Sequence, residues 1–210
     1  MPVNELFREY VRCVLSEKAT RSFDMEAFRH AANPRDYLND HATFIDYGIE
    51  REVFDTGLGY VIKWSMPDVA TQNKKEAELA RCAKGAPVPD VFARAKDFRW
   101  IAVKKVNPIR GAQLDGKVRK ITGYKDLDEF RLAIDVLTIN DYIERVIRQG
   151  NITRADAPAF IDRAKHVYET NDWFRSLVDM ISSCKMVGDL HQDNWGLDSQ
   201  GRLKVLDPGL

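Results

Sequence analysis

The sequence has 210 residues, of which 44% are hydrophobic, and its 32 lysines and arginines balance 32 aspartates and glutamates. A chain of this length buries roughly 70% of its unfolded surface, so we expect a self-sufficient core in one large domain or in one domain of two lobes. The balanced charge indicates neither a nucleic-acid partner nor an anionic membrane surface.

The cysteines and the N-terminal segment indicate the cellular compartment. Cys13, Cys82 and Cys184 are far apart and odd in number, which predicts free or buried thiols in a reducing cytosol, without a disulfide framework or a metal site. The N-terminus has acidic residues and no apolar signal-peptide core, and no apolar run approaches transmembrane length. We therefore expect a soluble cytoplasmic protein with no membrane partner.

Residues 1–42 are predicted to form a helical N-terminal extension. Apolar residues at spacings of three and four indicate a helix over about 3–15. A second short helix is expected over about 24–32, where Asn33-Pro34 would stop it. Neither segment carries recognisable chemistry, so we expect the extension to pack on the lobe that follows.

Residues 43–107 are predicted to form a β-rich lobe. Runs of β-branched and aromatic residues indicate strands over 43–47, 52–54 and 60–64, and the third of these carries Lys63. A helix over 71–84 follows and carries Glu76 and Glu78.

Two more strands, over 91–95 and 100–106, complete a predicted set of five. The cluster Asn107-Pro108-Ile109-Arg110-Gly111 breaks the pattern and is the natural position for a hinge.

Residues 108–210 are predicted to be mainly helical. Apolar steps of three and four indicate one long helix over about 128–149. A second helix starts after Asp156, and a third starts at Asn171 or Asp172 and leads to the C-terminal segment.

The C-terminal segment VGDLHQDNWGLDSQGRLKVLDPGL holds Asp189, Asn194 and Asp207. The turn residues at 198–201 join two short apolar runs, so we expect a hairpin that folds Asn194 back beside Asp207. An amide oxygen and two carboxylates in such a loop suit phosphoryl transfer, in which the protein positions groups and neutralises charge.

This segment resembles the catalytic loop and the aspartate-x-glycine segment of the protein-kinase-like superfamily. Gly188-Asp189-Leu190-His191 followed by Asn194 is most similar to aminoglycoside-phosphotransferase-type kinases and to protein kinases of some tailed bacteriophages. The resemblance implies an α+β, kinase-like, two-lobed fold. Its N-lobe, residues 43–107, would hold a five-stranded antiparallel sheet and one main helix, and its shortened helical C-lobe would span 108–210.

The resemblance also implies roles for individual residues, with ATP and Mg²⁺ as cofactors. Asp189 takes the place of the catalytic base, and Asn194 and Asp207 take the places of the metal ligands. Lys63 takes the place of the strand lysine that reaches the phosphates, and Glu76, with Glu78 as its substitute, takes the place of the helix glutamate that holds the lysine.

Further positions implied by the resemblance lie at the phosphate-covering turn, at the hinge and in the catalytic loop. Gly48 would lie in the phosphate-covering turn, although this turn has one glycine where the family has two or three. The backbone of Lys105, Val106 and Asn107 would hold the adenine. His191 would be part of the scaffold of the catalytic loop.

The sequence departs from the protein-kinase pattern at two places in the C-terminal segment. Val187-Gly188-Asp189 replaces His-Arg-Asp, and Pro208 replaces the phenylalanine of Asp-Phe-Gly. The missing arginine argues against control by activation-loop phosphorylation, and Pro208 leaves the ligand Asp207 in place.

The interpretation favoured by the sequence is a protein Ser/Thr kinase of minimal kinase-like fold, acting in the host cytoplasm if it is encoded by a phage. A small-molecule, aminoglycoside-type kinase is a near rival, and no acidic cluster beyond the catalytic loop indicates a polycationic acceptor. The sequence is also compatible with a pseudokinase that acts by binding a partner, and with a nucleotidyl transferase. The sequence ends at Leu210, directly after Asp207-Pro208-Gly209, so the hydroxyl-bearing acceptor is expected to contact the inserted helices, the extension or another chain.

Overall fold

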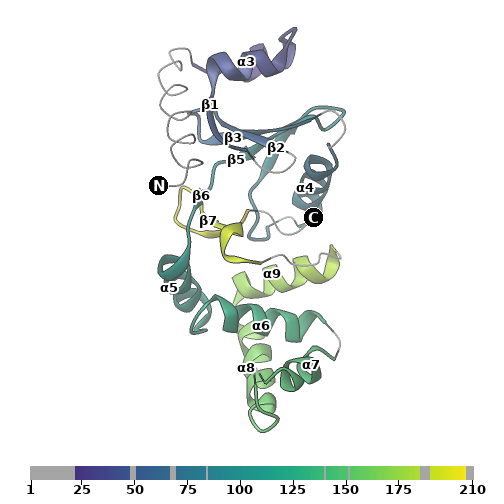
Figure 1. Cartoon of the computed structure of the whole chain (residues 1–210), viewed down its shortest axis with the longest axis vertical. Coiled ribbons are helices and arrows are strands. Elements are labelled where there is room, and N and C mark those ends of the chain that lie inside the picture. The colour runs from purple at the N-terminus through teal and green to yellow at the C-terminus, as the bar shows by residue number, and fades with distance from the viewer. Residues whose placement is uncertain are drawn as a thin grey trace. The chain divides into compact units, whose positions relative to one another are not determined.

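The computed structural model describes residues 22–47, 51–66, 70–83, 85–139, 141–150, 152–184 and 190–206 (Figure 1). The helix predicted over 3–15 lies outside these ranges. The chain divides into two compact units, the first formed by Met1–Glu78 with Asp90–Lys105 and the second by Leu79–Pro89 with Val106–Leu210.

The first unit is built on a five-stranded antiparallel sheet, as the sequence predicts, so the α+β fold class is confirmed. The strand order is β1-β2-β3-β5-β4, which leaves β3 in the centre. The strands are β1 (Thr43–Tyr47), β2 (Arg51–Asp55), β3 (Tyr60–Ser65), β4 (Val91–Arg94) and β5 (Trp100–Lys104).

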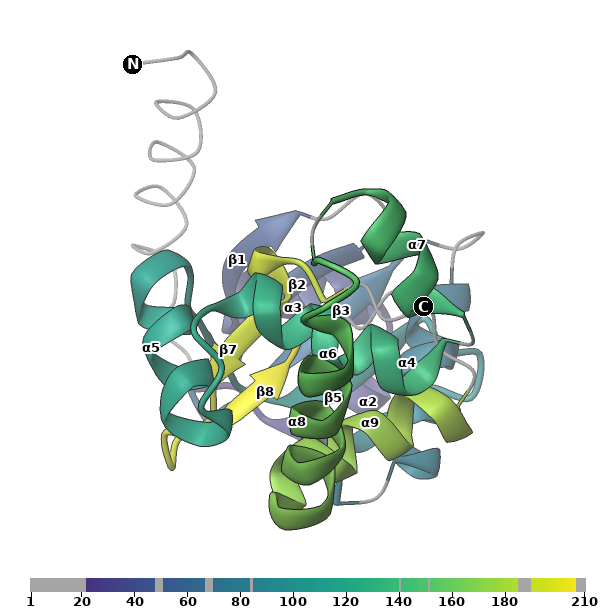
Figure 2. The same cartoon turned by 90° about the horizontal axis from the view of Figure 1, so that it is seen from below.

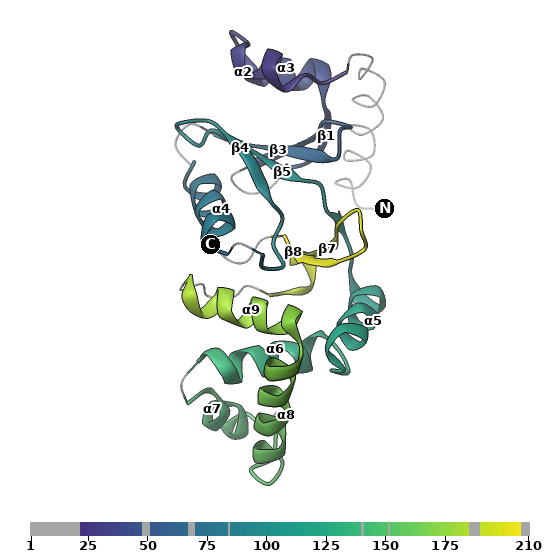
Figure 3. The same ribbon diagram turned by 180° about the vertical axis from the view of Figure 1, so that it is seen from behind.

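Two short helices, α2 (Met25–His30) and α3 (Pro34–His41), pack on one face of this sheet (Figure 3). Phe28 and Leu38 are fully buried in the same cluster as sheet residues such as Ile62. Helix α2 corresponds to the helix expected over 24–32. Helix α3 was not predicted, because Asn33-Pro34 was interpreted as a stop. In the structure Asn33 caps the N-terminus of α3 and Pro34 is its first residue, where the missing proline N–H costs nothing.

Helix α4 (Thr71–Cys82) covers the other face of the sheet (Figure 3). Its Ala77 packs against a cluster of Val61, Ile101 and Val103. Because successive side chains of a strand point to opposite faces, Val61 meets α4 while its neighbour Ile62 meets α2 and α3. The central strands are therefore apolar on both sides.

The second unit is mostly helical, and α6 packs against both α8 and α9 (Figure 2). Its core gathers large aromatic side chains, including Tyr124, Phe130, Phe174 and Trp195. The helices are α5 (Gly111–Thr122), α6 (Leu127–Thr138), α7 (Tyr142–Arg148), α8 (Ala157–Thr170) and α9 (Asp172–Ser183).

The single helix predicted over 128–149 is wrong. Helix α6 ends at Thr138, and α7 begins at Tyr142 after Asp141, whose φ of 57° is left-handed. The apolar periodicity continues across this break, so hydrophobic spacing alone could not reveal it. Aspartate is one of the few residues that tolerate this backbone conformation.

A second, three-stranded antiparallel sheet lies in the second unit, in the order β6-β7-β8. Figure 3 shows its strands β7 and β8. The predicted hairpin is present as β7 (Trp195–Leu197) and β8 (Leu203–Val205). The third strand, β6 (Asn107–Pro108), was not predicted, because its residues were interpreted only as a breaker cluster.

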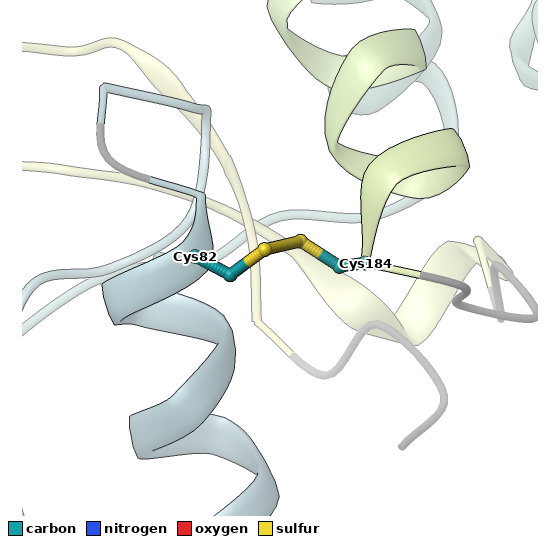
Figure 4. The surroundings of a disulfide bond; sticks show 2 residues. All are labelled: Cys82 and Cys184. Atoms are coloured by element: carbon teal, nitrogen blue, oxygen red, sulfur yellow. A yellow bond between two sulfur atoms is a disulfide. The ribbon is translucent and has the colours of Figure 1, made fainter.

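The second unit also contains a disulfide between Cys82, the last residue of α4, and Cys184, the C-cap of α9 (Figure 4). Their Cα atoms are 6.6 Å apart, and 102 positions separate them in the sequence. The prediction of free or buried thiols is therefore wrong for these two residues, because sequence spacing does not show which cysteines the fold brings together. Cys13 lies outside the described residues.

Within the described ranges, no helix has the length and apolar character needed to cross a membrane.

We predict that Cys82→Ser lowers the free energy of unfolding by about 2–4 kcal/mol, because the cross-link restricts the unfolded chain over a long loop. Urea unfolding of the variant, with Cys13→Ser as the matched control, measures this change. Alkylation of the unfolded protein followed by intact mass should add fewer alkyl groups before reduction than after it. An equal number before and after reduction would contradict the disulfide.

Candidate functional site

The centre of the first unit holds a buried ion pair between the central strand and the helix that covers it. Lys63 lies on β3, and its Nζ donates to Glu76 Oε1 at 2.6 Å and to Oε2 at 2.8 Å. The side chains are only 13% and 7% exposed, respectively. The structure therefore brings together the lysine and the glutamate that the sequence singled out, whereas Glu78, the substitute, is exposed to solvent.

A second cation shares the Glu76 carboxylate. Arg51 begins β2, and its Nη1 donates to Glu76 Oε2 at 2.5 Å with a side chain only 10% exposed. Arg51 was not predicted as a site residue, because the strand was expected to begin only at residue 52, whereas β2 begins at Arg51. Alternation counted back from Val53, which faces Lys63 across the sheet, would have placed Arg51 on the same face.

Asn73 fixes the first turns of α4 to the sheet. Its Nδ2 donates to the backbone carbonyl oxygens of Lys63, Phe98 and Arg99 at 3.0–3.3 Å, and its side chain is fully buried. Asn73 and Glu76 are three residues apart, so they lie on the same face of the helix. The helix is thereby held in the register that directs Glu76 toward Lys63.

The two cations determine the charge state of Glu76. Burial alone would raise the pKa of its carboxyl group, but the charges of Lys63 and Arg51 and their hydrogen bonds outweigh this effect, so the pKa is lowered from its ordinary value. Glu76 is therefore a carboxylate at neutral pH, and both Lys63 and Arg51 donate hydrogen bonds to it.

We predict that Glu76→Gln lowers the free energy of unfolding by about 3–5 kcal/mol at neutral pH, because it removes the buried carboxylate that Lys63 and Arg51 share. Glu78→Gln, on the exposed side of the same helix, is the control and should change stability by less than about 0.5 kcal/mol. Urea unfolding measures both changes.

The parent and Glu76→Gln can also be compared as a function of pH. A carboxyl group with a lowered pKa stabilises the fold fully above its ordinary pKa of 4.5, and this stabilisation is lost as the pH falls through the lower value in the folded state. The stability gap between the parent and Glu76→Gln should therefore narrow below about pH 4.5. A gap that stays constant down to pH 3 would contradict this assignment.

In the second unit, residues 190–206 form a short 3₁₀ helix followed by the hairpin β7-β8, and Asn194 lies where the two meet. Asn194 ends a short 3₁₀ helix, η2 (Gln192–Asn194), and is buried. Its carbonyl oxygen accepts a hydrogen bond from the Leu206 amide at 2.8 Å, which extends the pairing of β7 with β8. The backbone at Asn194 thus lies beside the residue directly before Asp207. Asp189 and Asp207 themselves lie outside the described residues.

Two neighbours stiffen this loop. Trp195 is fully buried, and its indole Nε1 donates to the carbonyl oxygen of Leu190, the residue after Asp189, at 3.2 Å. The His191 ring accepts from the amide of Asp193 at 3.2 Å and caps η2. His191 therefore fixes the backbone at the start of η2.

The predicted hinge residues divide between the two units. In the first unit, the amide of Lys105 donates to Gly59 O at 3.0 Å and its ammonium pairs with Asp55, so its backbone donor is already engaged. In the second unit, Asn107 belongs to β6 and pairs with Leu197 of β7. Gly48 lies outside the described residues.

Gly196 permits the close approach of β6 to β7. A Cβ atom at this position would lie 2.6 Å from both Asn107 O and Val106 Cγ1. The residue after Trp195 must therefore be glycine for β6 to approach β7 this closely. The sequence offered a signal for this requirement, since glycine within a strand often marks the close approach of another backbone.

We predict that Gly196→Ala lowers the free energy of unfolding by about 1–3 kcal/mol, because the methyl group overlaps a backbone oxygen that cannot rotate away. The control is Gly116→Ala within α5, where an added Cβ meets nothing within 4 Å and the helix gains propensity. Thermal or urea unfolding distinguishes them, and equal effects in the two variants would contradict the close approach.

A scan against protein-family models and a search of curated proteins both found no match. Among solved structures, the chain is similar to the ternary complex of APH(2")-IIa with streptomycin and ATP, with 19% sequence identity and a TM-score of 0.32. The similarity covers 55% of this chain and 39% of that chain.

Proposed function

We propose that this protein is an ATP- and Mg²⁺-dependent phosphotransferase of minimal kinase-like fold that transfers the γ-phosphoryl group of ATP to a hydroxyl group. The observation that carries the proposal is the buried ion pair between Lys63 on the central strand and Glu76 on the covering helix. A sequence motif supports it independently, since Asp189, Asn194 and Asp207 are spaced as in the catalytic and metal-binding segments of that superfamily.

The ion pair suits phosphate binding for a physical reason. A buried lysine without a partner would tend to lose its charge, whereas the Glu76 carboxylate keeps the ammonium protonated and fixes its position. The ammonium of Lys63 has three N–H groups that donate hydrogen bonds, so it can contact phosphate oxygens as well as Glu76. Lys63 would thus present a fixed positive charge to the phosphates of ATP.

The C-terminal loop supplies oxygen ligands of the kind that Mg²⁺ prefers. Asn194 provides an amide oxygen and Asp207 a carboxylate, and both are hard donors. Bound Mg²⁺ would neutralise charge on the phosphates. The hairpin β7-β8 supports this assignment, because the bond from Leu206 N to Asn194 O brings the chain preceding Asp207 alongside Asn194.

In the proposed reaction, Asp189 orients the acceptor hydroxyl and takes up its proton. The acceptor oxygen forms a bond to the γ-phosphorus while the bond from that phosphorus to the β–γ bridging oxygen breaks, and ADP leaves. The turn that contains Gly48 would cover the phosphates. The backbone of Val106 and Asn107, next to the engaged amide of Lys105, would hold the adenine.

A protein Ser/Thr side chain is the first acceptor class that we propose. The sequence motif is shared with small-molecule kinases. The argument for a protein acceptor is the similarity of the motif to phage protein kinases, which the lack of an acidic cluster beyond the catalytic loop reinforced. The tertiary structure weakens the second point, because side chains of α6 and of the residues just before it gather at a cavity of about 660 Å³. The cavity is lined by Asp126, Asp128, Glu129 and Asp135, together with Lys125 and Arg131.

A cationic small molecule with a hydroxyl group is therefore a second candidate acceptor. The observation that favours it is a neighbouring cavity of about 390 Å³, which shares Asp126, Asp128 and Arg131 with the first and also contains His191 and Gln192 of the loop. Carboxylates near the catalytic loop would attract ammonium groups of such an acceptor. Basic residues beside a peptide Ser/Thr would be attracted in the same way.

We predict that purified protein with γ-labelled ATP and Mg²⁺ transfers label to itself or to an acceptor, and that Asp189→Ala and Asp207→Ala each lower transfer at least 100-fold, because the base or a metal ligand is lost. Asp172→Ala, which removes a solvent-facing carboxylate on α9, is the control. The acceptor panel contains a basic Ser/Thr peptide, an acidic Ser/Thr peptide, an aminoglycoside and cell lysate. No transfer to any of these would overturn the proposed function.

Nucleotide binding is tested separately by thermal unfolding. A ligand at 100 times its dissociation constant stabilises the folded state by about 2.7 kcal/mol, so ATP with Mg²⁺ should raise the unfolding temperature by several degrees. Lys63→Met should abolish or strongly reduce the shift, because the phosphates lose the fixed positive charge of Lys63 while Mg²⁺ remains. Absence of a shift in the parent would favour the pseudokinase interpretation, in which the fold acts only by contact with a partner.

A further inference from the structure

We propose that Arg51 is a positioning residue for the phosphotransfer site: it holds the Glu76 carboxylate in place while Lys63 is shared between that carboxylate and a phosphate. The inference rests on the proposed function and adds a component that the sequence motif does not contain. It concerns the first unit alone, where Arg51, Lys63 and Glu76 all lie.

The hydrogen bonds at Glu76 show why a second cation matters. Oε1 accepts from Lys63, whereas Oε2 accepts from both Lys63 and Arg51. A phosphate that draws the ammonium of Lys63 toward itself weakens the bonds to both carboxylate oxygens. Arg51 still donates to Oε2 in that case, so the buried carboxylate keeps a charged partner and stays ionised.

Arg51 is itself held on the face from which it reaches Glu76. In the β2–β3 register it pairs with Ser65, and Val53 pairs with Lys63, which makes Arg51 a diagonal neighbour of Lys63 on one face of the sheet. Its Nη1 lies 3.4 Å from Asn73 Oδ1, one helical turn before Glu76. Arg51 therefore connects the start of β2 to two side chains on the same face of α4.

The position of Arg51 in the chain gives this contact a second consequence. It directly follows residues 48–50 of the expected phosphate-covering turn, which contains a single glycine. The guanidinium fixes the first residue of β2 to the helix that carries Glu76. One side chain thus fixes both the position of Glu76 and the backbone at the start of β2.

A double-mutant cycle tests the inference. Arg51→Met and Arg51→Lys are made in the parent and in Glu76→Gln, and kcat and KM for ATP are measured for each protein. In the parent we expect Arg51→Met to raise KM for ATP about tenfold with a smaller effect on kcat, because Lys63 contacts phosphate in both the ground state and the transition state. Arg51→Lys should restore KM to within about threefold, because an ammonium still pairs with Glu76.

The decisive comparison is between the two backgrounds. If Arg51 acts through Glu76, Arg51→Met should have less than about a twofold effect in Glu76→Gln, because the group it positions is already neutral. The matched control is Arg35→Met. Arg35 lies on α3 and pairs with Glu52, the residue after Arg51 on β2, so its loss is expected to leave KM for ATP unchanged. Thermal unfolding of every variant confirms that it is folded.

Two results would overturn the inference while leaving the proposed function intact: an equal rise in KM in both backgrounds, or a parent-like KM in Arg51→Met. If Arg51→Met does not fold, KM for ATP is measured for Arg51→Lys in the parent and in Glu76→Gln. A change in KM of equal size in both backgrounds would overturn the inference. A parent that neither binds nor uses ATP overturns the proposed function itself, and the inference with it.

Discussion

The first unit depends on the burial of one carboxylate. Removing a charged group from water is costly unless it is paired and hydrogen-bonded, and Glu76 meets this requirement with Lys63 and Arg51. These ion pairs join β2, β3 and α4. A shift of the helix relative to the sheet would separate Glu76 from Lys63 and Arg51 and leave a buried carboxylate without these charged partners. Stability and the geometry of the proposed phosphate site therefore rest on the same three side chains.

The second unit supports its loop in a different way, through packing rather than charge. Trp195 belongs to the aromatic core and also donates to Leu190, so the core fixes the backbone next to Asp189. Gly196 lets β6 approach β7 closely, and Leu206 extends the hairpin toward Asp207. The loop that carries the proposed metal ligands is thus anchored at both ends by described contacts, which suits a site whose task is to position groups.

Local patterns in the sequence predicted much of this structure, because strands, helices and turns are governed by residues a few positions apart. The five strands, the helix with Glu76 and the hairpin after Asn194 followed from alternation, helical spacing and turn residues. Errors arose where one local pattern allows two outcomes. An Asn-Pro pair can end one helix or begin the next, and here it begins α3. The apolar stripe continues from α6 into α7, although the helix is interrupted at Asp141, whose backbone is left-handed.

The sequence by itself determined the α+β class, the candidates Lys63 and Glu76, and the spacing of Asp189, Asn194 and Asp207, because these depend on periodicity and on residue type. Only the tertiary structure decided which distant side chains meet. Arg51 contacts Glu76 across 25 positions, and Cys82 joins Cys184 across 102. Such contacts depend on how sheets, helices and cores pack, which no pattern within a few residues encodes.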